Sequence, residues 1–199
     1  MARGKDERAR LLTLAGDEML RSGISGMSLS GLARSVGSNN RMLLYYFGSK
    51  EALLTEAGNE IALRFPHMQN VADALADRGP IDERLHSAWL ELRHPDNLPY
   101  LRLVFETFGV AAHSPKTYPE LLTATIGVLP TLVANAFRAE WGDGAGILQG
   151  AAEIVALWRG LQLGLILGEQ TDVLDRASLA MTQDVVVRCG GDLVSQAGS

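Results

Sequence analysis

The sequence predicts an all-α protein with a small N-terminal three-helix module and a larger C-terminal helical domain. Apolar residues recur every three or four positions along most of the chain, which is the spacing of one helix face. No segment of useful length shows the apolar–polar alternation of a strand, and Pro and Gly instead separate the helical segments. A chain of 199 residues is long enough for one small module and one larger core.

The first predicted helix spans about residues 6–21, where Leu11, Ala15 and Met19 recur at helical spacing. Gly23 and Gly26 frame the turn that follows it. We expect the apolar side of this helix to pack on the next two helices and to close a three-helix module.

The second and third helices are short and closely joined. Ser28 is a candidate N-cap, because its hydroxyl can accept a hydrogen bond from an unpaired N–H at the start of a helix. Gly37 can adopt the left-handed backbone that ends the second helix. Ser38 or Asn39 can then cap a third helix that runs to about Phe47. This outline is that of a helix-turn-helix, whose second helix enters a DNA major groove.

The residue types of the third helix suit contact with DNA. Asn and Arg can bond adenine and guanine edges with two hydrogen bonds, and a recognition helix meets base edges near its start. Tyr hydroxyls and Lys can bond phosphates. For any single residue, an N-cap or a solvated helix face is an equally good explanation. The candidate DNA-binding residues are Ser28, Asn39, Asn40, Arg41, Leu44, Tyr45, Tyr46 and Lys50.

The residues from about 8 to 60 also match a family pattern. The pattern has a polar residue opening the second helix, an aliphatic-Ala pair, a turn Gly, an aromatic pair with Phe, and Ser-Lys-Glu. Here these are Ser28, Leu32-Ala33, Gly37, Tyr45-Tyr46-Phe47 and Ser49-Lys50-Glu51. The stretch resembles the DNA-binding domain of TetR/AcrR-type transcriptional regulators. That family usually has Gly, Thr and Tyr where Arg41, Met42 and Leu44 stand, so Arg-Met-Leu indicates a sub-group.

The resemblance implies a homodimeric DNA-binding regulator, with residues 1–48 as the DNA-binding domain and residues 49–199 as the effector-binding and dimerisation domain. Its expected partners are double-stranded DNA, a second copy of the chain and a small, apolar effector. The expected action is repression at a palindromic operator, released by the effector. The alternative is a helical dimeric module that binds a ligand or a protein and has no specific operator.

Charge is divided unevenly along the chain, whose total is −5. Residues 1–50 contain eight basic and four acidic side chains, a net charge of +4, so the remaining residues carry −9. A basic N-terminal part can be drawn to phosphates while the acidic remainder is held away from them. Ordinary surface solvation is the alternative explanation.

Helices of the larger domain are predicted between Pro and Gly breaks. Pro130 is expected to kink or split the helix that contains it, near Val128. Residues 142–146 are expected to form a loop, and residues 190–199 a loose tail. The expected helices are 49–65, 66–76, 81–92, 98–113, 118–141, 147–168 and 172–188.

The segment 147–168 is the most apolar part of the chain. Polar residues such as Glu153 and Arg159 argue against a membrane span. Glycines four residues apart share a helix face and allow another helix to approach closely. We expect this helix and the last one to form a two-fold dimer interface; burial in the monomer core is the alternative. The candidate interface residues are Gly160, Gly164, Gly168 and Val185.

Large aromatic residues lie in the middle helices and in the 147–168 helix. Most are expected in the core, but an effector cavity would be lined by such side chains with a few polar groups. The candidate effector-binding residues are Trp89, Arg102, Phe105, Phe108, His113, Trp158 and Gln162.

The sequence gives little support for catalysis. The four histidines are scattered, with no pair at a common metal-ligand spacing, and no Gly-rich phosphate loop follows a strand. We therefore expect no enzymatic activity, no cofactor and no metal. The single cysteine, Cys189, and the absence of a visible signal peptide favour a cytoplasmic protein.

Overall fold

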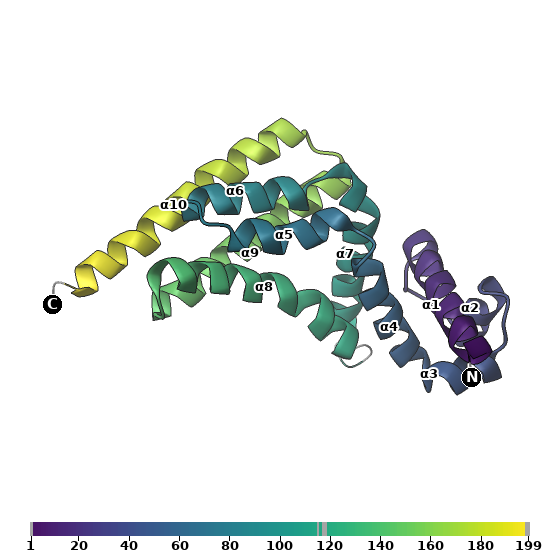
Figure 1. Ribbon diagram of the computed structural model, residues 1–199. Coiled ribbons are helices and arrows are strands. Elements are labelled where there is room, and N and C mark those ends of the chain that lie inside the picture. The colour runs from purple at the N-terminus through teal and green to yellow at the C-terminus, as the bar shows by residue number, and fades with distance from the viewer. Residues whose placement is uncertain (1, 115, 117–118, 198–199) are drawn as a thin grey trace. The chain divides into compact units, whose positions relative to one another are not determined.

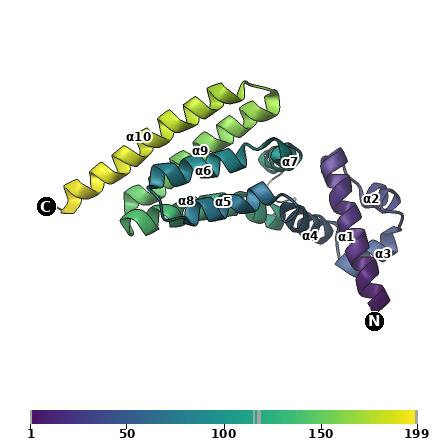
Figure 2. The same cartoon turned by 45° about the horizontal axis from the view of Figure 1, so that its top comes forward.

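The computed structural model describes residues 2–114, 116 and 119–197, and helices are the only regular elements in that part of the chain. Figures 1 and 2 show the helices in two views. Contacts divide the chain into two compact units. Unit 1 comprises Met1–Phe65 and Pro99–Thr125, and unit 2 comprises Pro66–Leu98 and Ile126–Ser199. The all-α prediction is therefore confirmed.

Unit 1 contains four N-terminal helices, nearly all of a longer helix and the start of another. They are α1 (Ala2–Ser22), α2 (Leu29–Ser35), α3 (Asn40–Phe47), α4 (Lys50–Ala62), α7 (Leu98–His113) and the first residues of α8 (Pro119–Trp141).

Unit 2 contains the remainder of α8 and five further elements. They are α5 (Pro66–Ala76), α6 (Ile81–Leu92), the 3₁₀ turn η1 (Pro95–Asn97), α9 (Ala145–Leu167) and α10 (Thr171–Ala197). Within this unit α5 packs on α6, and α10 packs on both α9 and α6.

Side-chain caps fix where the short helices of unit 1 begin. Ser28, Asn39 and Ser49 each accept a hydrogen bond at 3.0 Å from the backbone N–H three residues later. Each cap satisfies one helix-start N–H that would otherwise be unpaired. Such a cap stabilises the folded protein by about 0.5–2 kcal/mol relative to alanine at the same position. The predicted caps at Ser28 and Ser49 are confirmed, and Asn39 rather than Ser38 caps α3.

The core of unit 1 joins the three-helix module to later parts of the chain. Leu11 and Met19 of α1 are buried with Leu43 of α3, as predicted. The same core includes Leu103 of α7 and Leu121 of α8. The compact units are defined by contacts, and the division of function after residue 48 stays a prediction.

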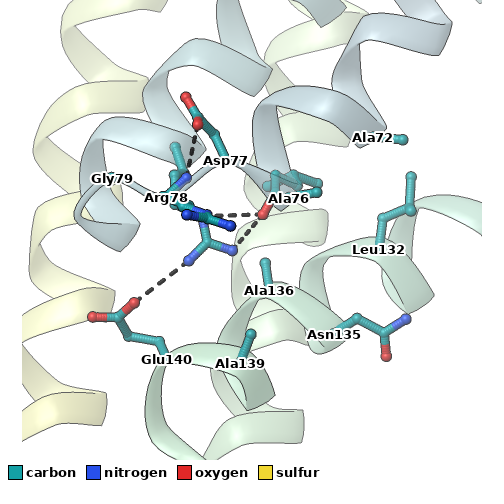
Figure 3. A pocket seen from close by; sticks show the side chains of 12 residues that line it. Ala72, Ala76, Asp77, Arg78, Gly79, Leu132, Asn135, Ala136, Ala139 and Glu140 are labelled. Atoms are coloured by element: carbon teal, nitrogen blue, oxygen red, sulfur yellow. Dashed lines mark hydrogen bonds and ion pairs between the residues drawn. The ribbon is translucent and has the colours of Figure 1, made fainter.

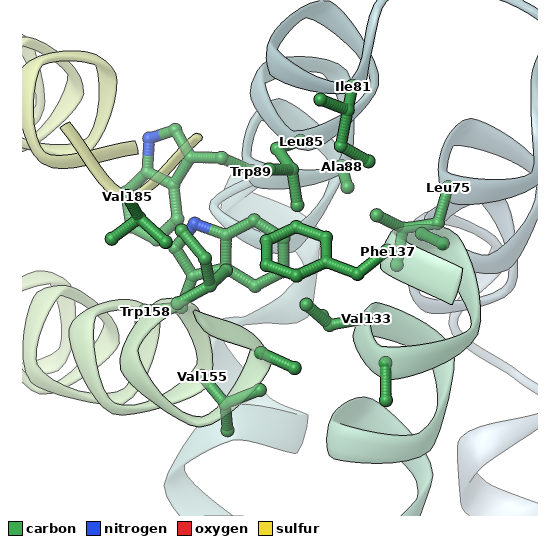
Figure 4. Packing of buried hydrophobic residues seen from close by; sticks show 14 of the residues in the cluster. Leu75, Ile81, Leu85, Ala88, Trp89, Val133, Phe137, Val155, Trp158 and Val185 are labelled. Atoms are coloured by element: carbon green, nitrogen blue, oxygen red, sulfur yellow. The ribbon is translucent and has the colours of Figure 1, made fainter. Parts of the chain in front are cut away.

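The core of unit 2 is built around three large aromatic side chains. Trp89, Phe137 and Trp158 are fully buried, and Figure 4 shows them together with the aliphatic side chains around them. The Nε1–H of Trp89 donates to Asp175 at 2.8 Å, so α6 is fastened to α10 by a hydrogen bond as well as by packing. Arg93 pairs with the same carboxylate, also at 2.8 Å.

Several helix limits differ from those predicted. The first helix begins at Ala2, and α4 ends at Ala62 rather than at residue 65. Helix α8 continues through Pro130, so of the predicted kink or split, the split is wrong. A proline removes one helix hydrogen bond, but neighbouring turns keep theirs. The last helix continues to Ala197 into the expected tail, because extending an existing helix needs no new nucleus. The predicted start of α8 at Tyr118 lies outside the described residues.

One described helix segment, Gly146–Leu167 in α9, is long and apolar enough to cross a membrane by length and composition. Its Ile154 and Trp158 side chains are fully buried in the core of unit 2. A core helix in a folded unit has this same composition, so the segment is weak evidence for a membrane span.

Candidate nucleic-acid interface

Helix α3 has one anchored face and one exposed face. Leu43 and Phe47 are buried in the core of unit 1. Asn40, Arg41, Leu44 and Tyr45 are exposed and recur at positions one and four apart, so they share the opposite side of the helix. Tyr45 is 77% exposed and Leu44 is 42% exposed. The short helix therefore presents a mixed basic, amide and aromatic surface.

Two asparagines at the start of α3 have internal partners. Asn39 is the N-cap and accepts a hydrogen bond from Met42 N–H. The Nδ2–H of Asn40 donates to Ser30 Oγ of α2 at 2.9 Å. Both side chains are exposed, so their remaining polar groups face solvent while their internal bonds fix the start of α3 against α2.

Arg41 is positioned differently from the asparagines. It is exposed, and it has neither a hydrogen bond nor an ion pair with any other described residue. A guanidinium has five N–H donors and no acceptor, so this side chain keeps its full bonding capacity for an outside partner.

The other predicted DNA-contact residues make hydrogen bonds or ring contacts within unit 1. Ser28 is the N-cap of α2. Tyr46 is half-buried, and its ring contacts those of Tyr45 and Phe47. Lys50 is half-buried and donates from Nζ to the Met27 carbonyl at 2.9 Å, which ties the start of α4 to the start of α2.

Arg8 has a role that the sequence analysis missed. Its Nη2 lies 2.5 Å from a Glu56 carboxylate oxygen, and its Nε donates to the Tyr46 carbonyl at 3.3 Å. The guanidinium also lies 4.7 Å from the Phe47 ring centroid, within the range of a cation–π contact. Arg8 thus joins α1 to α3 and α4. No local sequence signal could reveal this pair, because its members are 48 positions apart.

The charge difference along the sequence overstates the basic charge that this surface can offer. Arg10 and Arg21 pair with Glu7 and Glu18, each three positions away. Among residues 4–50, Lys5, Arg34 and Arg41 have no carboxylate partner in the described part of the chain. The surface around α2 and α3 therefore relies on a few positions rather than on total charge.

Glu106 of α7 holds the loop between α1 and α2. Its Oε1 accepts hydrogen bonds from the backbone N–H groups of Ile24 at 2.9 Å and of Ser25 at 2.6 Å. Gly23 precedes them with a φ of +72°, and a Cβ there would overlap the Glu106 carboxylate. A glycine is therefore required on two grounds, backbone conformation and space.

Comparisons with known proteins address the fold. No protein-family model matches this sequence, and no curated protein matches it. A candidate transcriptional regulator from Pseudomonas aeruginosa PAO1 aligns at a TM-score of 0.71 and 20% identity, covering 96% of this chain and 94% of that chain.

Two further solved structures carry the family name. A candidate TetR-family regulator from Rhodococcus sp. has a TM-score of 0.68 at 20% identity, covering 94% of this chain and 99% of that chain. One from Mesorhizobium loti MAFF303099 has a TM-score of 0.65 at 15% identity, with coverages of 93% and 97%. The chain has the fold of TetR-family transcriptional regulators. The Arg-Met-Leu sub-group stays a prediction.

Within this TetR fold, the seven predicted effector residues are divided between the two units. Trp89, Trp158 and Gln162 are buried in unit 2. In unit 1, Phe105 and Phe108 are half-buried and in contact with each other, whereas Arg102 and His113 are exposed. The Nε1–H of Trp158 is buried and has no hydrogen-bond partner among the residues that the structure describes.

An open surface pocket of about 540 Å³ lies in unit 2, between α5, α6 and α8 (Figure 3). Buried Arg84 donates from Nε to the Leu75 carbonyl at 3.0 Å, and its Nη1 lies 3.4 Å from Glu140. None of the seven predicted effector residues lines this pocket. Arg84 pairs with Glu140, and Asp77 and Arg78 add two more charged residues to the lining, so the pocket does not have the character expected of an apolar effector site.

The four predicted interface residues also have different environments. Val185 is buried in the core of unit 2. Gly164 is buried, and a Cβ there would approach the side chains of Glu169 and Leu174. Gly160 is exposed with open space around it, and Gly168 ends α9 with a φ of +86°. Close packing at Gly164 is therefore explained within the single chain.

Helix α9 nevertheless has a continuous apolar stripe on its surface. Its members are exposed, carry no charge and recur every three or four residues, so they share one face. They are Leu148, Ala152, Ala156, Gly160, Leu163 and Leu167. Leu148, Leu163 and Leu167 are 56%, 43% and 72% exposed. The neighbouring α10 adds exposed Val173, Leu179, Met181 and Val187.

Proposed function

We propose that the protein is a homodimeric, cytoplasmic DNA-binding transcriptional regulator whose α3 reads bases in the major groove. The observation that carries this proposal is the division of α3 into two faces. Leu43 and Phe47 anchor one face, while Arg41 and Tyr45 are exposed on the other. Arg41 suits the O6 and N7 acceptors of a guanine, and the Tyr45 hydroxyl suits a phosphate.

The dimer is proposed to form through α9 and α10. A continuous exposed apolar stripe is rare on a monomer and marks an interaction surface. Burial of one leucine side chain stabilises an interface by about 1.5–3 kcal/mol before the costs of association. In a two-fold dimer every stripe residue contributes to the interface from both protomers. The two DNA-binding modules of such a dimer would match a palindromic operator.

Repression is proposed to end when an effector binds and favours a dimer geometry with a different spacing between the two DNA-binding modules. An effector that binds that geometry ~100-fold more tightly supplies about 2.7 kcal/mol of bias. Trp158 and Gln162 are one helical turn apart on α9. The unpaired Nε1–H of Trp158 would give an effector acceptor a buried partner, and satisfying such a donor recovers about 1–3 kcal/mol.

Selection of bound duplexes from a random pool tests the proposal directly. We expect enrichment of two inverted half-sites whose centres are separated by about one helical turn, or a multiple of it. Recovery of unrelated sequences, or of no duplex at moderate ionic strength, would overturn specific DNA binding. That outcome would favour the alternative, a dimeric module that binds a ligand or another protein.

A further inference from the structure

The fold brings together two histidines that are 27 positions apart in the sequence. His67 lies in the first turn of α5, and His94 lies between α6 and η1, all within unit 2. Their imidazole rings stack with centroids 3.5 Å apart and an interplanar angle of 16°. Both side chains are half-buried, so solvent and ions can reach them.

Hydrogen bonds set which nitrogen of His67 faces outward. Its Nδ1 lies 2.7 Å from a Glu91 carboxylate oxygen, which also accepts from Asn70 Nδ2 at 3.2 Å. A carboxylate is an acceptor only, so Nδ1 carries the proton and Nε2 of the neutral ring carries the lone pair. Burial alone would raise the pKa of Glu91, but the bonds from His67 and Asn70 outweigh it and lower that pKa.

Hydrogen bonds from a buried asparagine hold the turn that carries His94. Asn97 is fully buried, and its Nδ2 donates to the carbonyls of Glu91 at 2.7 Å and Leu92 at 3.2 Å. The backbone N–H of Asp96 donates to His94 Nδ1 at 3.3 Å, so this nitrogen also carries a lone pair. The Asp96 carboxylate lies 3.7 Å from the same nitrogen and is 75% exposed.

We propose that His67, His94 and Asp96 form a binding site for a divalent transition-metal ion of the zinc class. One ligand atom of each side chain lies within 4.8 Å of the others. Two imidazoles and a carboxylate suit Zn²⁺ and Ni²⁺ rather than Mg²⁺ or Ca²⁺, which prefer oxygen ligands only. The proposal does not depend on DNA binding.

The geometry needs only a local adjustment. Ligands of a tetrahedral zinc ion at about 2.0–2.1 Å are separated by roughly 3.3 Å, close to the distance between His94 Nδ1 and Asp96. The lone pairs of two stacked rings lie in nearly parallel planes, so one ring turns about its Cβ–Cγ bond to share the ion. Three protein ligands leave the fourth position to water or another ligand. Glu91 supports His67 in the way that carboxylates support metal-bound histidines.

The test is calorimetric titration of the full-length, tag-free, chelator-treated protein with Zn²⁺, together with the visible absorption of bound Co²⁺. We expect one ion per chain. His67→Gln and His94→Gln should each weaken binding by more than ~100-fold, and Asp96→Asn by less, because its amide oxygen is a weaker ligand. Glu91→Gln, which touches no ion, should weaken it by about 10-fold.

His113→Gln is the matched control, because His113 is exposed and lies on α7 in unit 1. It should bind Zn²⁺ as the unaltered protein does, and circular dichroism should show every variant to be folded. The proposal is overturned if the unaltered protein binds no ion. It is equally overturned if the folded His67→Gln and His94→Gln variants retain the affinity of His113→Gln.

Discussion

At the scale of single residues, the proposed function depends most on Arg41. It is exposed on the outer face of α3, and no described residue bonds it. A guanidinium can read a guanine edge with two hydrogen bonds, whereas a lysine ammonium supplies only a point charge.

Arg41→Lys and Arg41→Ala should therefore have separable effects. Arg41→Lys should relax base preference at one operator position, at a cost of about 1–3 kcal/mol, while leaving non-specific affinity and its salt dependence unchanged. Arg41→Ala should relax preference and also flatten the salt dependence. Repeating the random-pool selection with both variants measures this. An unchanged operator from Arg41→Ala would rule out Arg41 as a base reader.

A second prediction at this scale concerns the loop held by Glu106. Gly23→Ala should lower the free energy of unfolding by more than Gly26→Ala, although both glycines have a φ of +72°. Each substitution places a side chain in left-handed backbone, at about 1–2 kcal/mol. Only Gly23→Ala also displaces the Glu106 carboxylate, because a Cβ at Gly26 would meet nothing within 4 Å.

Denaturant unfolding followed by circular dichroism measures both variants. Gly26→Ala is the matched control for backbone strain. Equal losses in the two variants would mean that the Glu106 hydrogen bonds add nothing to stability.

The sequence could predict only those residue roles that depend on residues a few positions away in the chain. Caps at Ser28 and Ser49 bond to groups three residues away, so their pattern is visible along the chain. Arg8 with Glu56, and His67 with His94, meet only because distant helices pack together. Lys50 is predicted to contact phosphate, and its bond to the Met27 carbonyl joins two residues that are 23 positions apart in the sequence.

At the scale of helices, spacing and Pro/Gly breaks were sufficient to locate most elements. They were not sufficient for α8 and α10. Pro130 and the Gly190-Gly191 pair lower helix propensity, but each acts on one or two turns of a helix of 23 or 27 residues. Neighbouring turns and tertiary packing outweigh such local costs.

The apolar stripe of α9 yields a prediction at this scale. Leu163→Glu should convert the dimer to monomers, because a charge would have to be buried twice in a two-fold interface. Leu90→Glu is a suitable control, since Leu90 has similar exposure, 37% against 43%, but lies on α6 outside the stripe. Sedimentation velocity distinguishes the two. A dimeric Leu163→Glu protein would show that another surface holds the chains together.

At the scale of the whole molecule, the sequence resemblance predicted the fold that the solved structures share. The placement of α7 and the start of α8 in unit 1 could not be predicted, because it depends on contacts such as Leu103 and Leu121 with the helices before residue 62. The same limit applies to the effector site. Aromatic residues are easily listed from the sequence, but the buried Nε1–H of Trp158, which has no partner in the described part of the chain, can be seen only in the structure.

The proposal that α3 binds a duplex is tested most directly by the salt dependence of affinity. Binding to the selected operator and to an unrelated duplex of equal length would be measured over a range of salt concentrations. We predict that log affinity falls linearly with log salt for both, by about 0.9 per phosphate contacted, and that the operator remains the tighter ligand throughout. Equal affinity for the two duplexes, or affinity that does not change with salt, would contradict DNA recognition by this surface.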